Sequence, residues 1–202
     1  MNGRSIPRMQ PNDYTLRDAT EADLPAIVAI YNSTIASRVA TADLEPVTVE
    51  TRRPWYDAHA QPNRPIWVLV DRAGAVGAWL SFDTFYPRAA YDGTAMIAVY
   101  VAPSCRRLGL GRRLLQEAIA RAPGLGLHTL LGYIFGHNEA SLRLFHAQDF
   151  VRQAHLPRVA VLDAAEIARP AGGRHGVRVL ARQMQATGLA AHHLDLPRWR
   201  HR

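Results

Sequence analysis

Hydrophobic positions near the start of the chain follow first an extended and then a helical spacing. Tyr14–Arg17 is a short apolar start that predicts a first strand. After it, Thr20 and Asp23 have the spacing of a capping box, with Asp in place of the usual Glu or Gln. The apolar positions that follow lie three and four residues apart, which predicts an amphipathic helix. They are Leu24, Ile27, Val28 and Tyr31.

The next apolar segments predict a helix followed by antiparallel strands. Ser33–Pro46 has the composition of a loop or a broken helix, and Thr48–Ala60 is predicted to be helical. Ile66–Val70 is a continuous apolar run rich in β-branched residues, and after a turn Ala75–Phe82 is its expected hairpin partner. Thr94–Val101 is predicted to be a further strand. The front half therefore favours an antiparallel sheet.

The second half alternates between the two spacings. Apolar residues of Leu110–Arg121 lie on one helical face, and Pro123–Gly126 ends this helix. The remaining predicted elements are the strand Thr129–Phe135, the helix Glu139–Gln148, the strand Phe150–Ala154 and the strand Val177–Arg182, with Asp163–Gly176 as a connecting loop. The order predicts a mixed α/β fold without internal repeats.

Length and composition are those of one globular domain. The chain has 202 residues, 48% of them hydrophobic. No apolar run approaches the roughly 18 residues that a membrane span needs, and residues 1–13 lack the apolar stretch of a secretory signal. A single cysteine, Cys105, suits a reducing cytoplasm, although a lone cysteine can also be a nucleophile. We expect a flexible segment 1–13, a domain 14–182 and a basic, disordered tail 183–202.

The positive charge lies at the ends of the chain. The net charge is +7, and all 24 basic residues are Arg. Residues 170–202 hold six Arg and one Asp, whereas residues 14–169 hold 16 Arg and 15 acids and are almost neutral. The only evidence for a nucleic-acid partner is therefore the basic tail. We expect neither nucleic-acid nor membrane binding.

The segment Val99–Gly111 carries the most specific chemical signal. A Val-x-Val strand runs into Arg106-Arg107-Leu108-Gly109-Leu110-Gly111, which opens a helix. Such a loop directs main-chain N–H groups at one point, where the helix dipole also favours an anion, so it predicts a phosphate site. The spacing is not that of the dinucleotide fingerprint, and a Walker A loop is excluded because the chain has no Lys.

This segment resembles the acetyl-CoA pyrophosphate loop of the GNAT superfamily. Five further segments resemble its phosphinothricin N-acetyltransferase-like branch, and the resemblance extends over about residues 14–162. They are Ile30–Asn32, Ala40–Pro46, Tyr86–Tyr91, Asn138–Ser141 and Leu156–Ala160. The resemblance implies the α/β (α+β) GNAT fold, a mixed central sheet of about six to seven strands flanked by helices.

The resemblance also implies an acetyl-CoA site and no metal. Val99, Tyr100 and Val101 would pair with the pantetheine arm, and Asn138 and Ser141 would lie beside the cofactor, although both also fit plain helix capping. The pyrophosphate would lie in the loop. The implied loop residues are Arg106, Arg107, Leu108, Gly109, Leu110, Gly111 and Arg112.

The base of the family pattern is missing. Met96 stands where the resemblance leads us to expect a Glu, and methionine cannot take a proton. Asp83, His137 and Glu139 are the alternative candidates, each with an ordinary structural explanation as well. Phe145 stands where many members have a Tyr that protonates the leaving thiolate.

The acceptor implied by the resemblance is a small amino acid or analogue. Arg38, Phe85, Arg88 and Tyr91 are the candidate acceptor-binding residues, because a guanidinium can bind a carboxylate or phosphinate through two hydrogen bonds. Two other functions stay open: a catalytically weak acyl-CoA-binding paralogue, which Met96 favours, and an acetyltransferase for protein N-termini or another amine. The branch also implies a homodimer.

Overall fold

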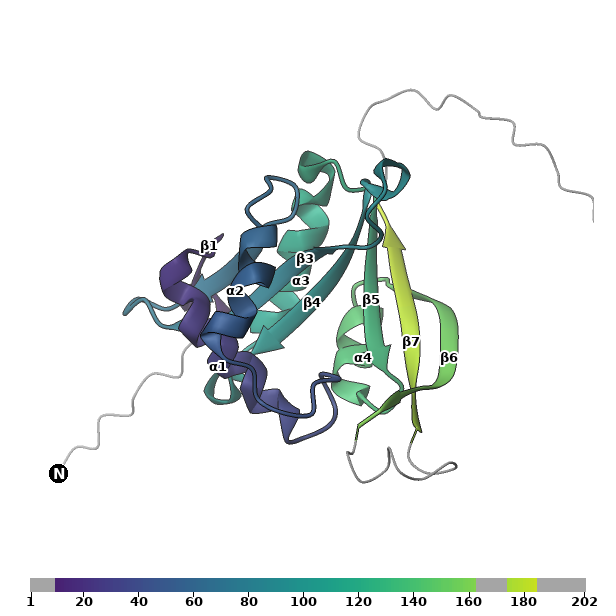
Figure 1. Ribbon diagram of the computed structural model, residues 1–202. Helices are drawn as coiled ribbons and strands as arrows, with labels where there is room; N and C mark the ends of the chain where they lie inside the picture. Colours follow the sequence, from purple (N-terminus) through teal and green to yellow (C-terminus); the bar gives the residue numbers. More distant parts are fainter. Residues whose placement is uncertain (1–9, 163–173, 185–202) are drawn as a thin grey trace, which may run out of the picture.

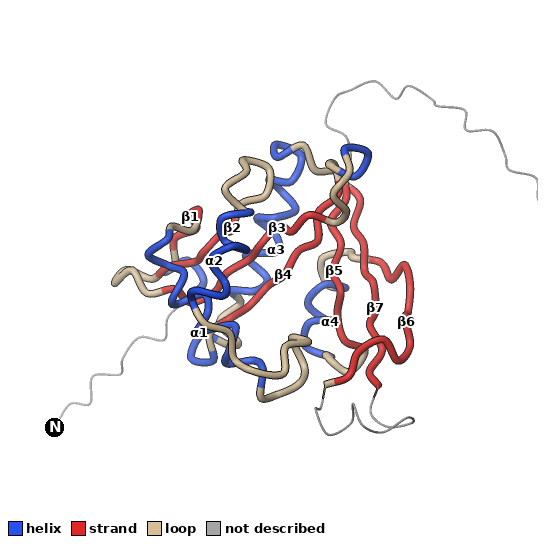
Figure 2. Tube along the Cα trace, viewed as in Figure 1, coloured by secondary structure: helices blue, strands red, loops and turns tan. Residues whose placement is uncertain are grey.

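A computed structural model of the protein describes residues 10–162 and 174–184. Its centre is a seven-stranded mixed sheet with the order β1-β2-β3-β4-β5-β7-β6 (Figures 1 and 2). Neighbouring strands are antiparallel except for β4 and β5, which are parallel. The strands are β1 (Thr15–Asp18), β2 (Ile66–Val70), β3 (Val76–Thr84), β4 (Thr94–Val101), β5 (Thr129–Phe135), β6 (Val151–Val161) and β7 (Arg174–Gln183).

Two helices cover each face of the sheet. The helices are α1 (Leu24–Ile35), α2 (Val49–Ala58), α3 (Leu110–Arg121) and α4 (Glu139–His146). Figure 1 shows α1 and α2 in front of the sheet and α3 and α4 behind it. Three of these helices, α1, α3 and α4, bury apolar residues against the sheet, whereas α2 contributes the partly buried Trp55 and Tyr56.

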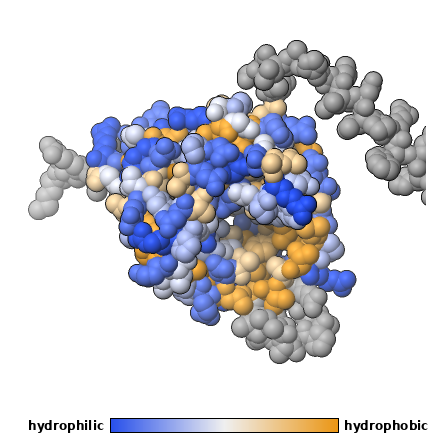
Figure 3. Space-filling view, turned by 45° about the horizontal axis from the view of Figure 1, so that its top comes forward, coloured by the Kyte–Doolittle hydropathy of each residue, from blue (hydrophilic) through white to orange (hydrophobic). Residues whose placement is uncertain are grey.

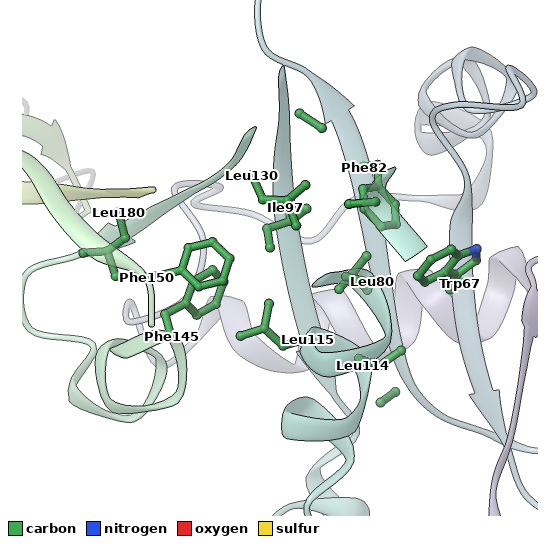
Figure 4. Packing of buried hydrophobic residues seen from close by; sticks show 14 of the residues in the cluster. Trp67, Leu80, Phe82, Ile97, Leu114, Leu115, Leu130, Phe145, Phe150 and Leu180 are labelled. Carbon is green, nitrogen blue, oxygen red and sulfur yellow. The ribbon is translucent and has the colours of Figure 1, made fainter. Parts of the chain in front are cut away.

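Two hydrophobic clusters hold these layers together. The larger lies between the sheet and α3 and α4, where Leu114 and Leu115 pack beneath Leu80 and Ile97 (Figure 4). The smaller joins α1 and α2 to the opposite face around the buried Trp79. Because alternate residues of a strand point to opposite faces, β3 and β4 supply both clusters at once. The central strands are thus fixed from both sides.

The capping box predicted before α1 is present. The carboxylate of Asp23 accepts hydrogen bonds from the Thr20 N–H and hydroxyl at 2.7 and 2.9 Å. Arg17 adds two charge-assisted hydrogen bonds to the same carboxylate, at 2.6 and 2.8 Å. This partly buried ion pair links β1 to the turn before α1.

Most predicted elements are confirmed, and four of them have exact bounds: Ile66–Val70, Thr94–Val101, Leu110–Arg121 and Thr129–Phe135. The last two strands are longer than predicted, because β6 continues to Val161 and β7 begins at Arg174. The β6 strand is an edge strand whose residues are mostly exposed, so it has no alternation of apolar positions that could mark its length.

Parts of the predicted terminal segments and connecting loop lie outside the described residues, namely 1–9, 163–173 and 185–202. Within the described part, Pro11–Asp13 forms a short 3₁₀ turn. The domain bounds proposed from the sequence therefore stay a prediction.

Candidate functional site

The loop before α3 presents a row of free main-chain donors. Within the part of the chain that the structure describes, the N–H groups from Arg107 to Arg112 have no hydrogen-bond acceptor, and the next N–H, of Arg113, bonds to the Gly109 carbonyl. Donors that converge at a helix N-terminus form a binding site for an anion. The geometry therefore agrees with the phosphate site that the loop sequence predicts.

Backbone conformation explains why this loop needs its first glycine. Gly109 is the N-cap of α3 and has a φ of +83°, which side chains rarely allow, and Arg107 also has a positive φ of 62°. A segment in which residues with positive and negative φ alternate forms a concave nest of N–H groups.

The second glycine, Gly111, allows close packing of the helix that it opens. A Cβ on Gly111 would lie 3.3 Å from Leu144 Cδ2 and 3.5 Å from Val101 Cγ2. Gly111 therefore allows α3 to approach α4 and β4 closely, and this packing places the free N–H groups.

Beside this loop, the sheet opens into a cleft. The parallel pairing of β4 with β5 stops at Met96, so the edge of β4 from Ile97 to Val101 faces β5 without pairing to it. The two strands diverge in Figure 1, and Figure 3 shows a hollow there with hydrophobic side chains along one side. The cleft has a volume of about 380 Å³. Its lining includes Ala40, Thr41, Ile97, Ala98, Val99, Tyr100, Tyr133, Phe135, Asn138, Ser141 and Phe145.

Asn138 and Ser141 line this cleft but already have structural partners. The Asn138 side-chain carbonyl accepts the Ser141 N–H at 3.1 Å and caps α4. Its amide nitrogen donates to the Val39 carbonyl at 3.1 Å, which ties the loop after α1 to this helix. The capping role is therefore present, and contact with a cofactor stays a prediction for both residues.

Met96 and Asp83 are direct cross-strand partners. The antiparallel register of β3 and β4 pairs them, so their side chains point to the same face of the sheet with Cβ atoms roughly 5 Å apart. This face also carries Ala98 and Tyr100, which line the cleft. The carboxylate of Asp83 thus lies next to the place where the family pattern has its Glu.

The Asp83 carboxylate is held by neighbours that stabilise its charge. Trp55 Nε1 donates to Oδ1 at 2.9 Å, and Ser81 Oγ donates to Oδ2 at 2.6 Å. Burial opposes the charge, but the nearby His59 ring, 3.4 Å away, and the hydrogen bonds from Ser81 and Trp55 outweigh it and lower the pKa of this carboxyl. The group is therefore ionised at neutral pH.

His59, which the sequence analysis did not single out, lies behind Asp83. Its Nδ1 donates to the Trp55 carbonyl at 2.7 Å, and its Nε2 lies 3.4 Å from Asp83 Oδ1. Nε2 is buried without a hydrogen-bond partner among the described residues. The sequence signal for it was weak, because a histidine near the end of a helix has many ordinary explanations.

The two other candidate bases have different surroundings. His137 is exposed, donates from Nε2 to the Arg38 carbonyl at 2.9 Å and stacks on Phe135. Glu139 is exposed in the first turn of α4 and pairs with Arg143 at 3.7 Å. Neither shares a face of the sheet with Met96 through strand register, as Asp83 does.

Two of the aromatic side chains that line the cleft, Tyr100 and Phe145, contribute no ready proton. Burial raises the pKa of the Tyr100 hydroxyl above its usual range, and that hydroxyl donates to the Ala40 carbonyl at 3.4 Å. Phe145 is buried against Gly132, where an added Cβ would lie 2.6 Å from its ring. The tight fit keeps this ring fixed beneath the cleft.

The predicted acceptor residues fall into two groups. Phe85, Arg88 and Tyr91 belong to one exposed aromatic loop, in which Arg88 lies 5.5 Å from the Tyr86 ring centre. Arg38 lies elsewhere, and its Nη1 donates to the Leu44 carbonyl at 2.7 Å. The guanidinium of Arg38 therefore holds the loop after α1.

Arg52 was also missed by the sequence analysis. It lies on α2, with its guanidinium carbon 4.8 Å from the Tyr31 ring centre and 4.3 Å from that of Trp55. The spacing Arg52-x-x-Trp55 was the available signal, because residues three apart are neighbours on a helix.

Two other kinds of site receive no support from the described residues. Across 10–162 and 174–184, no three His, Cys, Asp or Glu side chains form a group that could hold a metal ion. None of the helices described is long and apolar enough to cross a membrane.

Comparison with known proteins gives a consistent result. Residues 27–150 match the family model described as "Acetyltransferase (GNAT) family". A Bacillus subtilis protein named "Putative phosphinothricin acetyltransferase YwnH" is 46% identical over 84% of this chain and 99% of its own length. The L-methionine sulfoximine/L-methionine sulfone acetyltransferase of Pseudomonas paraeruginosa is 38% identical over 72% of this chain and 84% of its own length.

A solved structure extends the likeness to the fold. The phosphinothricin acetyltransferase of Sinorhizobium meliloti, crystallised with acetyl-CoA, superposes with a TM-score of 0.75 at 26% identity. The match covers 85% of this chain and 89% of that one.

Proposed function

The chain belongs to the acetyltransferase (GNAT) family, and from this premise we propose that it transfers an acetyl group from acetyl-CoA to the primary amine of a small amino acid or analogue. The names of its relatives support an amino-acid-like acceptor such as methionine sulfone or phosphinothricin. The observation that carries the proposal is the free N–H row of Arg107–Arg112 beside the open edge of β4.

Acetyl-CoA, the co-substrate, supplies the acetyl group as a thioester. We propose that the N–H row binds its diphosphate and that Val99–Val101 holds the pantetheine arm along the open edge. Asn138 and Ser141 also line the cleft, which supports their expected contact with this arm. An N–H on the edge of β4 would stabilise the oxyanion that develops on the acetyl carbonyl.

The acceptor amine must lose a proton before it can attack. The net reaction joins the amine nitrogen to the acetyl carbon, breaks the carbon–sulfur bond, and releases CoA as its thiol together with one proton. We propose that Asp83 receives the ammonium proton, directly or through one water, since its carboxylate is ionised and lies opposite Met96. The aromatic loop with Phe85, Arg88 and Tyr91 would close over the acceptor.

An assay of CoA release with a thiol reagent tests this function. We expect release to depend on L-methionine sulfone or phosphinothricin, with far lower rates for an aminoglycoside or a peptide N-terminus. If acetyl-CoA binds tightly but no CoA is released with any of these amines, the result would instead support the function of a catalytically weak acyl-CoA-binding paralogue.

Two further expectations go with this function. The exposed apolar side chains of Val151, Leu156 and Val159 on the edge strand β6 support a homodimer, which light scattering of the purified protein would detect. The cytoplasmic location expected from the single cysteine stays a prediction.

A further inference from the structure

Arg52 carries a positive charge that nothing in the described part of the chain neutralises. Its guanidinium makes no hydrogen bond or ion pair there, although it is half-buried between the rings of Tyr31 and Trp55. Its neighbour Arg53 differs, because it pairs with Glu21 at 2.9 Å. The two residues therefore form a natural pair for comparison.

Stacking on aromatic rings fixes a guanidinium without using its donors. The attraction acts through the flat face of the cation, while the N–H groups point outward along its edge. A planar cation held in this way is prepared to bind a carboxylate through two parallel hydrogen bonds. Arg52 is therefore held in place with its N–H donors free, as a residue that binds an anion should be.

The same tryptophan holds the opposite charge. The face of the Trp55 ring lies against Arg52 at 4.3 Å, and its N–H donates to Asp83 at 2.9 Å. The cation and the carboxylate do not pair with each other. One rigid indole therefore keeps two opposite charges close together but separate.

This pair of charges lies next to the cleft. The Tyr31 ring under Arg52 is 5.2 Å from the ring of Tyr100, which lines the cleft. The Tyr31 hydroxyl also bonds to Thr41, another lining residue. Asp83, in turn, is paired with Met96 on the strand whose open edge forms the cleft wall.

We propose that Arg52 and Asp83 bind an α-amino acid as its zwitterion, with the α-carboxylate on Arg52 and the α-ammonium beside Asp83. This inference rests on the proposed acetyl transfer and assigns the residues that would select its acceptor. Asp83 first holds the ammonium and then accepts one of its protons, so the nitrogen lone pair is freed beside the open edge of β4. An amine without a carboxylate would lose the contact with Arg52.

The experiment compares two acceptors in three proteins. The acceptors are L-methionine sulfone and its decarboxylated analogue 3-(methylsulfonyl)propan-1-amine, and the proteins are the native chain, Arg52→Gln and the matched control Arg53→Gln. Loss of a charge-assisted contact lowers affinity by roughly ten- to a hundredfold. Arg52→Gln should therefore raise the KM for the amino acid by about that factor and leave the KM for the amine almost unchanged.

The native protein alone provides a test that needs no variant, because it should favour the amino acid over the amine by a similar factor. Arg53→Gln should behave as the native chain does. Equal losses for both acceptors in Arg52→Gln, or an equal loss in Arg53→Gln, would overturn the assignment. So would a loss of discrimination that follows Arg88→Gln and not Arg52→Gln.

Failure of the proposed function would look different. If the native protein acetylates neither acceptor, calorimetric binding of L-methionine sulfone to the CoA-loaded protein still tests Arg52. If Arg52→Gln weakens this binding and Arg53→Gln does not, the assignment of Arg52 to the α-carboxylate is upheld. If the native protein does not bind the amino acid, or both variants bind it equally well, the assignment is overturned.

Discussion

The two halves of the site are built from different parts of the chain. The cofactor half, Arg107–Arg112 with the open edge of β4, consists mainly of main-chain groups. The acceptor half, around Arg52, Trp55 and Asp83, consists of side chains that hold one another. The first half depends on how the backbone is placed, so many side chains are compatible with it. The second half depends on the identity of each side chain, so a substitution such as Met96 can change its chemistry.

The largest effect should come from moving the main chain of the cofactor half. Gly111→Val would force α3 away from Leu144 and Val101 and misplace the free N–H groups. Losing two charge-assisted hydrogen bonds of about 1.5–3 kcal/mol each corresponds to a loss of acetyl-CoA affinity on the order of a thousandfold.

Calorimetry would measure this loss, with Gly124→Val as the matched control, because a Cβ on Gly124 meets nothing within 4 Å. By contrast, Arg106→Gln should change the affinity by less than about tenfold, in the range of one exposed charge contact. An effect of Arg106→Gln as large as that of Gly111→Val would contradict a cradle made of main-chain groups.

In the acceptor half, replacing a single side-chain oxygen of Asp83 should lower the catalytic efficiency. Asp83→Asn keeps the shape of the side chain but cannot accept the ammonium proton, so kcat/KM should fall by about a hundredfold while acetyl-CoA affinity stays constant. Asp57→Asn on the exposed side of α2 serves as the control.

The pH profile gives a second test of Asp83. Because its pKa is lowered, the carboxylate is ionised down to below its usual pKa of about 3.9. In the native protein, kcat/KM for the zwitterionic acceptor should therefore stay nearly constant between about pH 5 and 8, because Asp83 is ionised and the acceptor ammonium is protonated across that range. An unchanged rate in Asp83→Asn would exclude this residue as the base.

The framework of the acceptor half should depend on the partly buried pair of Arg17 and Asp23. Hydrogen bonds from Arg17 hold the pKa of Asp23 at about 2, below the usual value for an unfolded chain. The ion pair therefore contributes about 2 kcal/mol above about pH 4, and this contribution is lost as the pH falls through 2.

Asp23→Asn should lower the free energy of unfolding in urea by about 2 kcal/mol at pH 7 and by much less at pH 2. Asp18→Asn, an exposed neighbour, should show no such pH dependence. A loss of equal size at both pH values would show that the carboxylate charge is not the cause.

The smallest effect should come from restoring the Glu of the family pattern. Met96→Glu places a second carboxylate directly opposite Asp83, and like charges in that position destabilise a sheet by about 1 kcal/mol or less. If Asp83 is already the base, kcat/KM should change by only a few fold.

The double variant sharpens this result. Adding Met96→Glu to Asp83→Asn should recover most of the lost activity, because a carboxylate again faces the acceptor. A large gain from Met96→Glu alone would show instead that the native protein lacks a base.

This difference between the halves also explains what the sequence could predict. The strand Thr94–Val101, the loop and the helix Leu110–Arg121 are continuous in the chain, so local spacing and the positive φ of Gly109 could be anticipated. The acceptor half brings together α2, β3 and β4, and only the strand register places Asp83 opposite Met96. Arg52 was missed for the same reason, because the two aromatic rings that it contacts, Tyr31 and Trp55, come from different helices, α1 and α2.

The extent of β6 could not be predicted for a different reason. An edge strand that is exposed along most of its length has no buried face to impose alternation on the sequence. Pairing with β7, which lies beyond a long connection, determines its length instead.

The measurement closest to the central claim is a calorimetric titration of the folded protein with CoA and, separately, with pantetheine, which lacks the diphosphate together with the 3′-phosphoadenosine attached to it. If the N–H groups of Arg107–Arg112 bind that diphosphate, CoA should bind with clear heat and pantetheine at least about a hundredfold more weakly. Equal affinity for both compounds, or no heat with CoA, would contradict the account.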